Sequence, residues 1–314
     1  MTAIHYDEVL TRLITRAAGR LDHTLERETP AVASALLPWL QTLTTSGRLV
    51  DYFTHPRRFP MLLLPWWAAE VAGSRGAEDF HGDVVYSTMC AYCQVRLMDD
   101  VVDRRGEPGL ELVPATAVLH TECLYPYLRH FPAEAPFWPY YRSRWLAATN
   151  AAIEVPGRAL TTAELGERAV ARIGPATIPL AAVLWHAGRG ELIGPWCRFT
   201  LGLARVEQLL DDLTDWHHDA ERGQSNVLLA EGARHVTPDE PAEAWVIREG
   251  LLWALDSAAA SLAPLRAEAA ALGSEAAGRF LDHRADLIAK TRRELEPGVR
   301  QLDRLTRAWK GGLA

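Results

Sequence analysis

The sequence predicts an all-α protein. Apolar residues recur at three- and four-residue spacing along most of the 314 residues, and no stretch shows sustained two-residue alternation. A composition of 48% hydrophobic and 23% charged residues is sufficient for one large core or two modest ones. The breaks at 106–109, 132–139 and 156–157 are too short to be flexible interdomain linkers. We therefore expect a single all-α domain over residues 1–314.

The apolar period also predicts where the helices lie. They are expected at 4–26, 31–45, 61–74, 81–104, 112–130, 136–153, 162–173, 176–187, 192–222, 239–270, 274–295 and 298–310. Two of the starts have the capping-box pattern, Thr161 with Glu164, and Thr237 with Glu240 after Pro238. Gly174-Pro175 is expected to end the helix that contains Arg172, because proline removes a backbone donor and clashes with the preceding turn.

Charge and composition exclude several classes of protein. A formal net charge of −7 and a pI near 5.9 provide no basic surface for nucleic acid. Four cysteines are too few for a disulfide framework in a chain of this length. The first residues lack the pattern of a signal peptide, and the longest apolar run, 59–69, is well short of the roughly 20 residues that span a membrane. We expect a soluble, cytoplasmic protein with no membrane span.

A first acidic cluster, DDVVD at 99–103, ends a helix that is otherwise apolar. Since each helical residue advances about 100°, Arg96, Asp99, Asp100 and Asp103 share one face. Carboxylates at the end of a buried helix are costly unless they are paired or bound to a metal ion. The cluster therefore predicts a bound cation.

A second acidic cluster lies in DDLTDWHHD at 211–219. Asp211, Asp215 and Asp219 stand at i, i+4 and i+8, on a stripe shared with Gln208 and Arg222. Aspartates one turn apart repel each other, and aspartate is a mediocre helix former. The row therefore disfavours the helix on which it lies, and such a conflict is typical of a functional site. Mg²⁺ prefers a few carboxylates together with water and substrate phosphate. Two such clusters predict a site for Mg²⁺ and a diphosphate.

The two motifs resemble those of the class I isoprenoid synthases, the superfamily of terpene cyclases and trans-polyprenyl synthases. DDVVD is similar to the aspartate-rich DDxxD motif, and 211–219 is similar to the second metal motif, about 110 residues further on. The stretch DAERG that follows is similar to squalene and phytoene synthases. The resemblance implies a helical bundle around a central apolar cavity, and it leaves a homodimer open.

The resemblance also implies roles for particular residues. Three Mg²⁺ ions would be held by a row of aspartates: Asp99 and Asp103 from the first motif, and Asp211, Asp215 and Asp219 from the second. Catalytic roles fall to Asp99, Asp100, Asp103 and Arg172. The diphosphate of a linear prenyl substrate would be bound by arginines, namely Arg172, which lies 39 residues before Asp211, together with Arg222, Arg104 and Arg105.

Three reactions of this superfamily remain open. Cyclisation to a terpene, a lyase reaction, is favoured by the 11 tryptophans, because aromatic faces can stabilise a passing cation. Elongation with isopentenyl diphosphate is favoured by the layout of 55–73, although Pro56 stands where elongases have a lysine. Squalene-type coupling is favoured by DAERG alone. Outside the superfamily, a non-enzymatic helical module is the further alternative.

Overall fold

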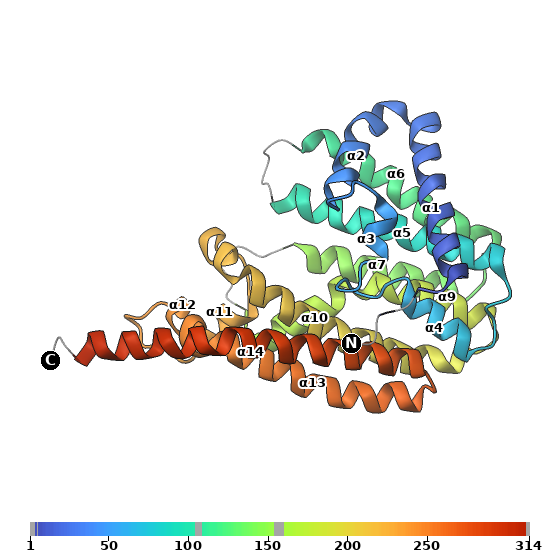
Figure 1. Cartoon of the computed structure of the whole chain (residues 1–314). Helices are drawn as coiled ribbons and strands as arrows, with labels where there is room; N and C mark the ends of the chain where they lie inside the picture. The colour runs from blue at the N-terminus through green and yellow to red at the C-terminus, as the bar shows by residue number, and fades with distance from the viewer. Residues whose placement is uncertain (1–3, 5, 104–108, 154–159, 312–314) are drawn as a thin grey trace. The chain divides into compact units, whose positions relative to one another are not determined.

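The computed structural model describes residue 4 and residues 6–103, 109–153 and 160–311, with the side chains of these ranges except Asp103, Asp303 and 305–311. Every regular element in this part of the chain is a helix or a helical turn, which confirms the all-α prediction (Figure 1). Across the same residues, no helix combines the length and the apolar character that crossing a membrane requires.

The chain divides into two compact units. The N-terminal unit comprises Ala3–Ala148 and Gly174–Cys197, and the C-terminal unit comprises Thr149–Ile173 and Arg198–Ala314. Helices α7 (Phe137–Ala152) and α10 (Ile193–Arg222) each contribute residues to both units. Two compact units can belong to one folding domain or to two, so the single domain over residues 1–314 stays a prediction.

The N-terminal unit is a set of helices around α5. In chain order, its elements besides α7 and the start of α10 are α1 (Glu8–Glu28), α2 (Pro30–Thr42), α3 (Leu49–Phe53), α4 (Leu63–Val71), α5 (Glu78–Asp103), η1 (Leu110–Leu112), α6 (Val113–Leu124), η2 (Tyr125–Arg129), η3 (Gly174–Thr177), α9 (Ile178–His186) and η4 (Gly190–Leu192). Helix α5 packs against α1 and α6, and α4 packs against α9 (Figure 1). The almost wholly apolar α9 is buried along nearly its whole length, as its sequence IPLAAVLWH predicts.

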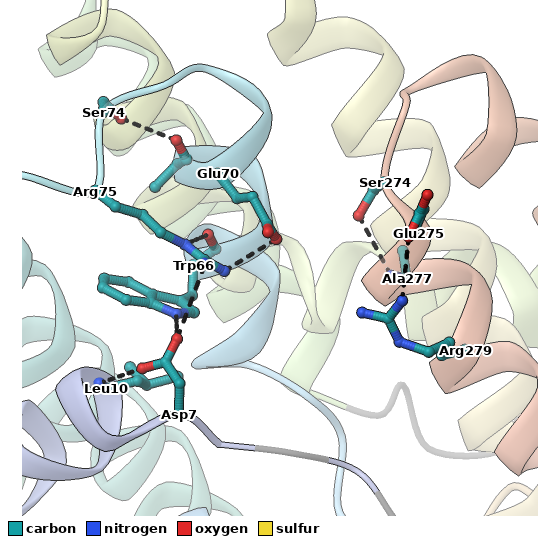
Figure 2. Close-up of polar contacts among 11 residues, drawn as sticks. Asp7, Leu10, Trp66, Glu70, Ser74, Arg75, Ser274, Glu275, Ala277 and Arg279 are labelled. Carbon is teal, nitrogen blue, oxygen red and sulfur yellow. Dashed lines mark hydrogen bonds and ion pairs between the residues drawn. The ribbon is translucent and has the colours of Figure 1, made fainter. Parts of the chain in front are cut away.

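Two polar contacts fix the entry of the chain into this unit. Asp7 caps α1, because its Oδ1 accepts a 2.8 Å hydrogen bond from the backbone N–H of Leu10. Its Oδ2 accepts a 2.7 Å bond from the indole N–H of Trp66 on α4, over which Arg75 lies (Figure 2). The start of α1 is thereby tied to α4.

A buried carboxylate, Asp83, ties α5 to its neighbours. Its Oδ1 accepts from Arg20 of α1 at 3.0 Å and from Arg129 of η2 at 2.5 Å, and its Oδ2 lies 2.8 Å from His130 Nε2. Since a buried charge is costly without partners, this convergence of three donors is what allows an aspartate in the interior of α5.

The C-terminal unit contains the longest helices. Its elements are α8 (Thr162–Arg172), most of α10, α11 (Val227–Gly232), α12 (Ala242–Trp245), the π-helical turn η5 (Val246–Gly250), α13 (Leu251–Ala271) and α14 (Glu275–Gly311). Helices α13 and α14 pack along each other after a tight turn at Gly273, whose φ of 71° favours glycine (Figure 1). Ser274 caps the new helix by accepting from the Ala277 N–H at 3.3 Å (Figure 2).

The predicted break between 274–295 and 298–310 is wrong. Helix α14 runs through Pro297, although an interior proline costs about 3 kcal/mol. Glu296 accepts from Arg292 at 3.0 Å one turn before it and from Arg300 one turn after it. The Glu296–Arg300 pair spans the proline, and both (i, i+4) pairs offset part of its cost.

One predicted helix start is confirmed and the other is wrong. Thr161 and Glu164 form a reciprocal capping box at the start of α8. The helix expected from 239 begins instead at Ala242, after Pro241, and Glu240 pairs with Arg248. The physical reason is that a residue before proline avoids the α conformation, so Pro241 keeps Glu240 out of the helix.

Candidate functional site

The first acidic cluster occupies the C-terminal end of α5. Asp99 and Asp100 are half-buried, and the helix ends at Asp103, whose side chain lies outside the described residues. The last turn carries no basic residue, and the C-terminal end of a helix dipole is itself negative. The aspartates therefore lie where negative charge destabilises a helix. This cost in stability favours a function for them.

Asp100 is held by two side chains of the protein. The indole N–H of Trp39 on α2 donates to its Oδ2 at 2.9 Å, and Arg96 Nη2 lies 3.4 Å from its Oδ1. The sequence pattern did not identify Trp39, which is 61 residues away and has no local signal of this role. Asp100 is thus a carboxylate that serves the fold, although the resemblance gives it a catalytic role.

The second acidic cluster lies along one face of α10, in the C-terminal unit. Asp211 and Asp215 are exposed, and Asp219, one turn further on, is half-buried. The hydroxyl of Thr214 donates to Asp215 Oδ1 at 3.1 Å. As the i, i+4, i+8 spacing predicts, the three carboxylates follow one face of a continuous helix.

The aspartate beside Asp211 behaves differently. Asp212 is 6% exposed; its Oδ1 accepts from Gln208 Nε2 at 2.7 Å and its Oδ2 from the Val227 N–H at 2.8 Å. Burial raises the pKa of Asp212 above its usual range, and these two hydrogen bonds oppose the rise. The adjacent pair is therefore divided, with Asp212 turned into the protein and Asp211 towards solvent.

Asn226 joins α10 to α11. Its side-chain N–H₂ donates to the backbone carbonyl of Asp212 at 3.0 Å and to Asp219 Oδ2 at 2.8 Å. Its Oδ1 caps α11 by accepting from the N–H groups of Leu228 and Leu229. We did not predict this residue or α11, although an asparagine before the apolar run VLL is a readable helix-start signal.

The predicted diphosphate-binding arginines are placed in part. Arg172 is the last residue of α8 and is half-buried, which confirms that the helix breaks before Gly174-Pro175. Arg222 is the last residue of α10 and is exposed. Arg104 and Arg105 lie outside the described residues. That these arginines converge on one ligand stays a prediction.

The two acidic clusters belong to different units, so the structure describes each by itself and their facing one another stays a prediction. In the described part of the chain, no three His, Cys, Asp or Glu side chains gather closely enough to hold a metal ion. Side chains one helical turn apart have Cβ atoms about 5–6 Å from each other, so one helix face supplies an ion with few ligands. Carboxylates arranged in this way, with water and phosphate completing the shell, suit Mg²⁺.

No family model, curated protein or solved structure matches the chain. Membership of the isoprenoid synthase superfamily therefore stays a prediction that rests on the two sequence motifs.

Proposed function

We propose that the chain is a Mg²⁺-dependent class I isoprenoid synthase that removes diphosphate from a linear prenyl diphosphate and cyclises the product to a terpene. The observation that carries the proposal is that the aspartates of α10 differ in burial and in contacts. Asp212 makes the buried structural contacts, while the exposed Asp211 and Asp215 continue in a row with Asp219 along one face. A helix that needed carboxylates for stability alone would gain nothing from this row, since neighbouring charges repel.

The chain's own residues would divide the work of binding. Asp99 and Asp103 from α5, together with Asp211, Asp215 and Asp219 from α10, would hold the cations. Arg172 and Arg222, each at the C-terminal end of a helix, would donate to the diphosphate oxygens. When bound, Mg²⁺ supplies neutralisation of the charge that develops on the leaving diphosphate.

The test is an assay of the full chain with geranyl, farnesyl and geranylgeranyl diphosphate. We expect Mg²⁺-dependent release of diphosphate, abolished by a chelator, and a cyclic hydrocarbon in the mass-spectrometric product analysis. Longer linear products that appear when isopentenyl diphosphate is added would identify an elongase, and a head-to-head dimer would identify a coupling enzyme. Absence of diphosphate release from all three substrates would refute the enzymatic proposal.

Three variants link the activity to the acidic rows. Asp99→Asn and Asp215→Asn should each lower diphosphate release by at least about tenfold, because each removes a charged ligand. Asp239→Asn is the matched control, since it makes the same charge change at an exposed aspartate in the loop before α12. If all three variants had equal activity, neither acidic cluster would account for the observed turnover.

A further inference from the structure

The contact between Trp39 and Asp100 has the features of a built positioning bond. Trp39 is 6% exposed, and its indole N–H, a donor with no acceptor capacity, lies 2.9 Å from Asp100 Oδ2. Arg96 approaches the other carboxylate oxygen at 3.4 Å from the same helix. Both oxygens of Asp100 are therefore in contact with donors of the protein, one of which comes from a separate helix, α2.

This bond acts on the part of α5 that carries the first acidic motif. Asp100 immediately follows Asp99, and consecutive helical residues point about 100° apart, so fixing one sets the direction of the other. Trp39 is a rigid, buried ring, whereas Arg96 is a flexible side chain that is 51% exposed. The indole is thus the donor that can fix the rotation of this turn.

We propose that Trp39 is a positioning residue for the acidic end of α5, holding Asp100 as an anchor so that cation binding falls to the neighbouring positions of the motif. This inference rests on the proposed function. It reassigns Asp100 from a group that contacts the cation to a group that orients those that do. Bonds of this kind behind metal ligands commonly change metal affinity by about 10- to 100-fold when they are removed.

The test measures binding rather than turnover. The probe is Mg²⁺ in the presence of inorganic diphosphate, and the readout is the thermal unfolding midpoint as Mg²⁺ is raised. Trp39→Phe removes the N–H and keeps an aromatic ring, and should raise the half-saturating Mg²⁺ concentration about tenfold. Asp100→Ala should raise it by a similar factor, and the double variant should match the single variants, because all three lose the same bond.

Trp66→Phe is the matched control. Its indole N–H donates to a carboxylate, Asp7, at 2.7 Å within the same unit (Figure 2), but this pair ties α1 to α4. It should lower the unfolding midpoint without ligand as Trp39→Phe does, and leave the half-saturating Mg²⁺ concentration within twofold of that of the parent chain.

The outcomes separate this inference from the proposed function. If the parent chain shows no Mg²⁺ response with diphosphate and releases none from prenyl substrates, both proposals fall. If the parent responds and Trp39→Phe responds at the same concentration, only the role of Trp39 is overturned. The same holds if Trp66→Phe shifts the response equally, if the effects of Trp39→Phe and Asp100→Ala multiply, as they would if Trp39 acted independently of Asp100, or if Asp100→Ala shifts the response far more than Trp39→Phe, as it would if Asp100 bound the cation itself.

Discussion

The side-chain amide of Asn226 donates a 2.8 Å hydrogen bond to the carboxylate of Asp219. With its second bond, to the Asp212 carbonyl, this amide spans two turns of α10, while its oxygen caps α11. Asn226 is 2% exposed, so water cannot replace these partners. One residue therefore fixes the end of the second acidic row and the start of the next helix.

Substitutions of Asn226 should separate these two roles. Asn226→Ala should cost about 2–4 kcal/mol in the free energy of unfolding, because it removes both the cap and the buried bonds to α10. Asn226→Ser keeps a capping oxygen but not the reach to Asp219, and should cost about 1 kcal/mol less than alanine. Urea denaturation measures both values. A serine variant as stable as the parent chain would show that the bonds to α10 contribute nothing.

The neighbouring aspartates Asp211 and Asp212 should respond in opposite ways to the same change. Asp212→Asn turns an amide N–H₂ towards a donor, the Val227 N–H or Gln208, and should cost about 1–3 kcal/mol in unfolding free energy. Asp211→Asn, on the exposed face, should change stability by no more than about 0.5 kcal/mol and still reduce the Mg²⁺ response. Chemical denaturation and a Mg²⁺ titration with diphosphate check the pair. Equal destabilisation by both changes would contradict the division between them.

Two threonines with the same sequence signal should differ in their contribution to stability. Thr161→Ala removes an observed capping box on α8 and should cost about 1 kcal/mol. Thr237→Ala should be neutral within about 0.5 kcal/mol, since the helix begins five residues later. Thermal or urea unfolding of the two variants, made in the same background, is sufficient. A cost at Thr237 as large as that at Thr161 would mean that the loop before α12 has a capping role of its own.

How much of the fold could be predicted from the sequence depended on how far apart in the sequence the interacting residues are. The long helices and the shared face of Asp211, Asp215 and Asp219 follow from a local period, and the structure has them. The short α3 and α11 were not predicted, since five or six residues give too little period to detect. Pro297 and Pro241 are a different case, because there one local rule competes with another: (i, i+4) ion pairs of Glu296 accompany a proline inside a helix, and the restriction on Glu240 before Pro241 opposes the predicted helix start.

The candidate site shows this limit more sharply. The sequence identified the acidic rows but assigned the adjacent aspartates Asp99 and Asp100 to one function. Only tertiary contacts separate them, because Trp39 reaches Asp100 across 61 residues. No local pattern records such a contact.

A buried histidine should make the protein sensitive to acid. His81 is 3% exposed, and its Nε2 lies 2.8 Å from the Ser74 carbonyl oxygen, to which it donates as a neutral ring. Burial lowers the pKa of His81, and the Ser74 bond opposes this. An unfolded histidine binds a proton near pH 6.5, where the folded His81 does not, so the free energy of unfolding should fall as pH drops below about 6.5.

The variant His81→Gln tests this assignment. A glutamine amide can still donate to the Ser74 carbonyl but binds no proton, so the fall in stability below about pH 6.5 should become shallower. The slope should not vanish, because burial also lowers the pKa of His120 and of His186. Urea unfolding at several pH values gives the slope. A slope identical to that of the parent chain would remove His81 from the explanation.

The buried pair of Glu207 on α10 and Arg284 on α14 provides the last prediction. Arg284 is 1% exposed and its Nε lies 2.8 Å from Glu207 Oε1. Burial raises the pKa of Glu207 and the guanidinium opposes the rise. Arg284→Met should therefore cost about 3–5 kcal/mol in unfolding free energy, since it leaves a buried carboxylate without its cation.

The cost of Arg284→Met should also depend on pH, and the direction of this dependence follows from the protonation of Glu207. In the folded variant Glu207 stays protonated and neutral, whereas in the unfolded chain it loses this proton near the ordinary pKa of glutamate, about 4.3. In the folded parent chain burial already raises the pKa of Glu207 to about 7, and loss of the guanidinium raises it further. The two folded states therefore differ in bound protons only above about pH 7, so the cost should grow as the pH rises above about 7. Adding Glu207→Leu should recover most of the lost stability, because two apolar side chains need no compensation. If the double variant is no more stable than Arg284→Met alone at pH 8, packing rather than charge accounts for the loss.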